Sequence, residues 1–391
     1  VADYINFLPG TDDDDSVSYN IAAGQADPIR WLMSSNDLQL GTLAQEFAAF
    51  GGGLGDPITP SNTRIVPQSG EGSAGIQPVK IGTETVYVNR ASRKVFALVF
   101  DASTNSYISQ DLTKFADHLF VGRMVERIAW VKNPIQCVFV LLDNGVLLSL
   151  TYNRQEEVFA WAVQEIGGTG TVVEDIAALP STDGTVDDLW MIVKRTVNGG
   201  TVRYVEYLAP PFEPTSTTDK NSAQYMDSAL EYSGSAVTSL GGLFHLEGET
   251  VKVMGAGGLQ TSKVVSNGVI TGLTSAAQFW IGLGYTSVLR TLRIEPVGAA
   301  LAGRTRKVSK VTARILNSLA GLVGLTEALA VKQLVNQTSY PPGTTTTPLR
   351  TGDVDCNLPG NFDTEGQFTI VQSDPLPLDI IGLTSWVTGS D

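Results

Sequence analysis

The chain has 391 residues, and its 40 acidic against 26 basic residues give a formal net charge of −14. This excess of acid argues against broad binding to nucleic acid or to an anionic membrane surface. With only two cysteines and two histidines, the sequence excludes a disulfide scaffold and predicts no Cys/His metal site. Forty glycines and a charged fraction of 17% favour a turn-rich, mainly β protein.

No apolar stretch approaches the roughly 18 residues that a membrane helix needs, so we expect no membrane insertion. The chain begins Val1-Ala2-Asp3, without a signal-like apolar core. We interpret it as a processed product or as the C-terminal part of a longer chain.

A diffuse repeat runs through the first 210 residues. Four central apolar strands align on Leu32, Val86, Val138 and Trp190, at intervals of 54, 52 and 52 residues. A polar turn and a second apolar strand follow each of them. A period near 50 with three or four short strands is typical of propeller blades, which stack because one small sheet cannot bury both its faces alone. An ordinary meander or sandwich is the alternative.

Two details of this pattern are further expectations. The second to fourth repeats have a leading strand, at residues 78–81, 127–130 and 175–178, whereas the first repeat lacks one. Helical patterns are found only at 43–50 and 326–334.

The run Pro210-Pro211-Phe212-Glu213-Pro214 marks a change of composition and a predicted domain boundary. We therefore predict a mainly β chain, with a partial or complete β-propeller over 1–210 followed by a β-rich platform domain. The platform takes residues 211–239 and 274–391. A small β-barrel-like insertion takes 240–273, where short strands alternate with glycine turns.

The histidines, cysteines and carboxylates show no arrangement that indicates a catalytic site. We therefore expect no catalytic, cofactor-binding or metal-ligating residues. His118 and His245 lie in apolar contexts and are predicted to be packed, hydrogen-bonded imidazoles. Cys137 opens an apolar strand and is predicted to be a core residue, whereas Cys356 lies in a polar segment and is predicted to be exposed.

The most unusual charge feature is a basic cluster between residues 304 and 314. It contains five bases and no acid, in an alternating pattern that predicts a strand with one buried face. Two interpretations stay open: contact with DNA or a neighbouring subunit, or a solvated face that balances local carboxylates. The five bases are Arg304, Arg306, Lys307, Lys310 and Arg314.

Eight segments, in this order, resemble the tail nozzle family of short-tailed bacteriophages and related prophages, also called tail tubular protein B or stabilisation protein. They are residues 30–34 with 37–42 (RWLMS, DLQLGT), 76–79 (IQPV), 90–95 (RASRKV), 111–113 (DLT), 150–156 (LTYNRQE), 204–208 (YVEYL), 246–249 (LEGE) and 284–287 (GYTS). The resemblance covers nearly the whole chain, although the family has a longer portion before the first motif.

The resemblance implies a structural protein of the virion tail. Such a subunit would belong to a homohexameric ring attached to an adaptor ring, with fibres or spikes outside. Double-stranded DNA would pass through the channel without sequence-specific binding. The acidic composition is compatible with this role, because a carboxylate-rich wall repels phosphates.

Two loops, residues 54–63 and 337–349, are candidates for narrowing the channel, and both are ordinary surface loops on the alternative interpretation. The named positions are Leu54, Asp56, Thr59, Tyr340 and Thr344.

The alternative function is a tail-associated propeller that binds or cleaves carbohydrate. A glycosidase needs two carboxylates about 5 to 9 Å apart. Acids such as Asp175, Asp187 and Asp188 are available, but no spacing in the sequence singles out a pair.

Overall fold

The computed structural model describes residues 8–21, 27–52, 56–216, 223, 225–255, 258–294, 304–335 and 348–389. The chain divides into two compact units. The first contains 1–164, 172–193 and 205–208, and the second contains 165–171, 194–204 and 209–391. Within the described ranges, no helix is long and apolar enough to cross a membrane.

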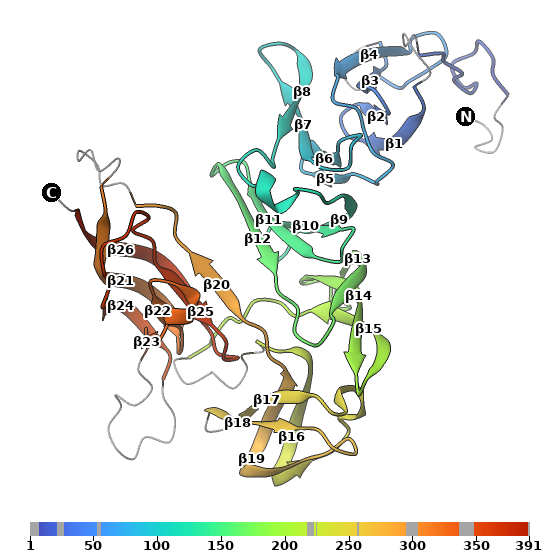
Figure 1. Ribbon diagram of the computed structural model, residues 1–391. Coiled ribbons are helices and arrows are strands. Elements are labelled where there is room, and N and C mark those ends of the chain that lie inside the picture. The colour runs from blue at the N-terminus through green and yellow to red at the C-terminus, as the bar shows by residue number, and fades with distance from the viewer. Residues whose placement is uncertain are drawn as a thin grey trace. The chain divides into compact units, whose positions relative to one another are not determined.

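Strands dominate both units, and the sheets of the first unit follow one another along the chain (Figure 1). The first sheet contains β1 (Ile29–Ser34), β2 (Leu38–Thr42), β3 (Glu46–Phe50) and β4 (Arg64–Ser69). The second contains β5 (Val79–Ile81), β6 (Glu84–Val88), β7 (Val95–Asp101) and β8 (Ser106–Asp111). The third contains β9 (Val125–Val131), β10 (Cys137–Leu142), β11 (Leu147–Asn153) and β12 (Val158–Gln164).

A fourth sheet has three strands, β13 (Val172–Pro180), β14 (Asp187–Val197) and β15 (Gly200–Leu208). In all four sheets the spatial order of the strands is their order in sequence, which is the antiparallel meander of a propeller blade. The structure therefore confirms the predicted mainly β fold with propeller blades. We call the four sheets blades 1 to 4.

The apolar side chains of blade 2 explain why the blades stack. Alternate residues of a strand point to opposite faces of its sheet. Val86 and Val88 join a core with Val138 and Val140 of blade 3. Tyr87, between them in sequence, packs instead with Trp31 of blade 1. Both faces of blade 2 are thus buried, as the repeat predicted.

Blade 1 corrects two expectations. The sheet is complete, and β1 is its leading strand, so the first repeat does not lack one. Residues 43–50, expected to be helical, contain β3 instead. The alanines of this segment favour a helix locally, but Phe47, Ala48 and Ala49 are all buried, which requires apolar neighbours on both sides of an extended strand.

Beyond residue 209, the first sheet of the second unit is four-stranded and antiparallel, in the order β16-β19-β17-β18. Its strands are β16 (Asp227–Leu240), β17 (Thr250–Gly255), β18 (Gly258–Val264) and β19 (Ile270–Leu283). One apolar core spans Leu240 to Leu283. The module is wider than the predicted insertion over 240–273, because the 14-residue strands β16 and β19 belong to the same sheet.

Two more sheets follow and share one core, which includes Val311 and Ile315 on one side and Val323 and Ile370 on the other. The first sheet has the order β20-β25-β22-β23 and contains β20 (Ser287–Arg290), β22 (Leu322–Gly324), β23 (Lys332–Gln333) and β25 (Thr369–Gln372). The second has the order β24-β21-β26 and contains β21 (Arg306–Ser318), β24 (Arg350–Asn357) and β26 (Asp379–Gly389). Residues 326–334, also expected to be helical, form only a 3-10 turn at Glu327–Leu329 followed by β23.

Candidate functional sites

The predicted basic cluster lies on or just before β21, and two of its cations pair with carboxylates of the neighbouring strand β24. Lys310 Nζ lies 2.8 Å from Asp355 Oδ2 and 4.5 Å from the centre of the Trp386 ring. Arg314 makes a bidentate pair with Asp353, at 2.7 and 3.0 Å. The partners hold the pKa of both carboxyl groups below the ordinary value, Arg314 for Asp353 and Lys310 for Asp355.

The other three bases of the cluster have different surroundings. Arg306 is fully buried, Lys307 is half-buried, and Arg304 is exposed just before the strand. The structure therefore does not bring the five cations together as one exposed surface. For Lys310 and Arg314 it matches the second interpretation, in which local carboxylates balance the bases.

Of the five predicted gate positions, Leu54, Tyr340 and Thr344 lie outside the described residues. Asp56 is exposed, and Thr59 is buried. The backbone N–H of Thr59 donates to Asn62 Oδ1 at 2.8 Å, and the Thr59 carbonyl accepts a hydrogen bond from Thr63 Oγ1 at 2.6 Å. This part of the loop is thus held by its own short-range hydrogen bonds.

The histidines and cysteines differ from expectation at two positions. His245 Nε2 lies 3.1 Å from the Ser228 carbonyl oxygen, as expected for a hydrogen-bonded imidazole, but His118 is exposed on a 3-10 helix. Both cysteines are buried, including Cys356, because β24 turns its side chain into the core shared by the two sheets. Burial raises the pKa of Cys137 to about 11 and also raises that of Cys356.

Two of the three acids named for a glycosidase pair are engaged by partners of their own. Arg127 Nε lies 3.1 Å from Asp175 Oδ1. Asp187 Oδ2 accepts hydrogen bonds from the backbone N–H groups of Lys132 and Asn133, at 2.8 and 3.3 Å. Asp187 thus ties β14 to the turn after β9, which is a structural role, and Asp188 is the next residue of the same strand.

A hollow that the sequence did not reveal lies between blades 2 and 3, with a volume of about 790 Å³. We call it the interblade groove. Its blade 2 wall is the β5–β6 turn, residues 80–84. Its blade 3 wall consists of Trp130, Lys132, Gln136 and residues 152–155.

Glu84, Tyr152 and Arg154 organise the wall of this groove. Glu84 pairs with Arg154 Nε and accepts a hydrogen bond from the Tyr152 hydroxyl. Arg154 Nη2 donates to the Tyr152 oxygen at 3.0 Å, and Nη1 donates to Gln110 Oε1 at 2.8 Å. Burial, followed by Glu84, raises the pKa of Tyr152. These contacts link the two blades and fix the positions of the side chains in the wall.

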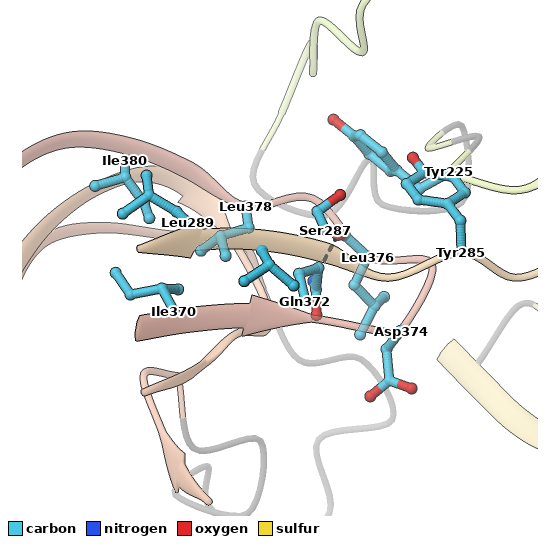
Figure 2. Close-up of a pocket in the computed structure, with 11 residues that line it drawn as sticks. Tyr225, Tyr285, Ser287, Leu289, Ile370, Gln372, Asp374, Leu376, Leu378 and Ile380 are labelled. Atoms are coloured by element: carbon cyan, nitrogen blue, oxygen red, sulfur yellow. Dashed lines mark hydrogen bonds between the residues drawn. The ribbon is translucent and has the colours of Figure 1, made fainter. Parts of the chain in front are cut away.

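A second, smaller pocket of about 360 Å³ lies in the second unit, beside β20 and β25 (Figure 2). Leu289, Ile370 and Ile380 lie toward one end of the view, and Tyr225 and Tyr285 toward the other. Burial is the main reason that the pKa of each tyrosine is raised to about 12. Of the residues that line this pocket, Asp374 alone carries a charge at neutral pH, and it pairs with Lys252 at 3.3 Å.

Comparison with known proteins gives no match to any family model and no match to any curated protein. Solved structures similar to this chain include an exo-β-1,3-galactanase from Phanerochaete chrysosporium, at 10% identity and a TM-score of 0.26, covering 91% of this chain and 80% of that one. Another is the xyloglucan PUL GH43B protein of Bacteroides ovatus, at 10% identity and a TM-score of 0.24, covering 92% and 89%.

These neighbours correct one expectation. We expected no enzyme, but both structures are of glycoside hydrolases, so that exclusion is withdrawn. At such identities and TM-scores, the likeness assigns no activity, substrate or catalytic residue to this chain.

Proposed function

We propose that this chain is a structural subunit of the tail nozzle of a short-tailed bacteriophage. The proposal rests on the eight segments that resemble that family, from residue 30 to residue 287. They fall in both units. Some lie within strands, such as residues 30–34 in β1, and others lie at turns, such as residues 90–95 before β7 and residues 150–156 at the end of β11. Because the similar segments are spread along the chain, they favour a fold shared with that family over a single shared binding site.

The charges are compatible with a wall past which DNA slides. The chain carries a net charge of −14, and Lys310 and Arg314 are matched by carboxylates of its own. Cations that are paired in this way give phosphates little to bind. Large exposed apolar side chains are also present, among them Phe115 at 95% and Phe244 at 71% exposure, as expected of a subunit with neighbours.

The partners in this proposal are other copies of the chain in a hexameric ring, an adaptor ring and fibres or spikes. Electron microscopy of the purified protein and of virions tests it directly. We expect rings whose pore admits a DNA duplex, and labelled antibodies against the chain should bind the tail. A protein that stays monomeric at every concentration and is absent from virions would overturn the proposal.

A second candidate is a propeller that binds or cleaves carbohydrate, and the interblade groove favours it. The groove combines the Trp130 ring, the amides of Gln136 and Gln155 and one carboxylate, Glu84. Aromatic faces together with hydrogen-bonding groups are what a sugar ring requires. A binding and hydrolysis screen against bacterial surface polysaccharides tests this candidate, and no binding to any of them would reject it.

A further inference from the structure

Two lysines line the interblade groove from opposite sides. Lys80 lies on β5 of blade 2, and Lys132 directly follows β9 of blade 3. Both are exposed, and neither side chain has an ion pair or hydrogen bond within the described residues. The two lysines therefore place two positive charges on opposite walls of one groove.

The carboxylates near the groove do not cancel these two charges. Glu84 is the one carboxylate in the lining, and its oxygens are engaged by Arg154 and Tyr152. Asp187, the acid that binds the backbone of Lys132, accepts two backbone hydrogen bonds there. Counting Arg154, the lining has three cations against one carboxylate.

The remaining lining groups suit a polyhydroxylated ligand. Trp130 is half-buried, and its indole N–H has no partner within the described part of the chain. Gln136, Asn153 and Gln155 add amides that both donate and accept hydrogen bonds. A volume of about 790 Å³ lies in the range of small-molecule sites.

We propose that the interblade groove binds an acidic saccharide, an oligosaccharide that carries carboxylate or phosphate groups. Lys80 and Lys132 attract the anionic groups, while Trp130 contacts a sugar ring. This proposal rests on the carbohydrate-binding candidate above and is independent of the nozzle proposal. It concerns binding, since cleavage by a carboxylate pair requires a second carboxylate that the lining of this groove does not contain.

The test measures binding by calorimetry, using the full chain. The probes are a galacturonic acid oligomer, a neutral glucose oligomer of equal length and inorganic phosphate. The variants are the double substitution Lys80→Gln with Lys132→Gln and, as a matched control, Lys114→Gln, an exposed lysine of the same unit outside the groove. The indole N–H signal of Trp130, assigned with Trp130→Phe, reports by NMR whether the ligand occupies the groove.

We expect the acidic oligomer to bind more tightly than the neutral one, to shift the Trp130 signal, and to lose about ten-fold in affinity in the double variant but not in Lys114→Gln. Equal binding of both oligomers, unchanged in the double variant, would overturn the charge selectivity and leave the carbohydrate-binding candidate standing. Binding of neither oligomer would overturn both. Displacement of the acidic oligomer by phosphate at equal concentration would show a simple anion site and would also overturn the proposal.

Discussion

The hydroxyl of Ser109 in β8 donates a hydrogen bond of 2.8 Å to the hydroxyl of Ser69 at the end of β4, which joins blade 2 to blade 1. The contact belongs to a chain of polar groups. The Tyr87 hydroxyl lies 2.7 Å from Ser109 Oγ, and Ser69 in turn donates to Glu46. Apolar contacts between stacked blades do not depend on direction. The hydrogen bonds of this polar network do, and they therefore fix how the two blades are aligned.

Removal of the Ser109 hydroxyl should destabilise the first unit. In Ser109→Ala, the Tyr87 hydroxyl and Ser69 each lose a partner in a largely buried site, at a cost of roughly 1–3 kcal/mol. Chemical denaturation of the variant measures the change in the free energy of unfolding. Ser262→Ala, at an exposed position of β18, is the control and should change it by less than about 0.5 kcal/mol. Equal effects of the two substitutions would refute the role of the network.

Glu46 should make the stability of the protein depend on pH. Burial raises its pKa in the folded state above the ordinary 4.5, although Ser69 and Ser73 act in the opposite direction. A raised pKa of an acid means that the folded state holds the proton more tightly, so the wild-type protein loses stability as the pH rises from about 4.5 to the folded-state pKa.

Glu46→Gln removes this titration, and the stability of the variant relative to the wild type should therefore increase with pH over that range and then level off. Denaturation midpoints between pH 4 and pH 8 measure the difference. A relative stability that falls as the pH rises would contradict the assignment.

Gly145 should be essential to the contact between blades 3 and 4. Its φ is +78°, and a Cβ there would lie 2.2 Å from Val172 Cγ1. Gly145→Ala thus adds a clash to backbone strain, with an expected loss of roughly 2–4 kcal/mol. Gly122→Ala is a matched control, since its φ is +69° and nothing lies within 4 Å of the added Cβ. Thermal unfolding of both variants separates the two contributions, and losses of the same size would show that the clash is relieved.

Asp353 and Asp355 should prevent Arg314 and Lys310 of β21 from binding anions. In the double variant Asp353→Asn with Asp355→Asn, Arg314 and Lys310 lose their partners and become available to an anion. We expect the variant to elute from a heparin column at a higher salt concentration than the wild type. Asp101→Asn with Asp183→Asn changes the net charge equally at two sites of the first unit, away from this strand. If that control elutes equally late, net charge alone explains the shift.

The sequence predicted a good part of the fold because alternation and spacing are local properties. The leading strands of blades 2 to 4 were recognised from apolar runs such as Arg127–Trp130 in β9. At β3 the sequence predicts a helix, because alanine-rich residues have helical preferences, but burial on both faces of the sheet overrides them.

The candidate sites were less predictable. The basic residues of β21 were visible in the sequence, but Asp353 and Asp355, which pair with two of them, are some 40 residues away and meet them only through the β21–β24 register. The sequence does not predict the interblade groove. Glu84 and Arg154 belong to different blades, and only the packing of blade 2 against blade 3 brings them together.

The sequence alone determined that this is an acidic β protein built from repeats of about 50 residues. Strand alternation and turn residues are local properties, which neighbouring positions in the sequence are enough to show. Only the tertiary structure decided which charges remain available. A cation is paired if folding places a carboxylate within a few ångströms of it, and otherwise it remains available to a ligand. That carboxylate can come from any part of the chain.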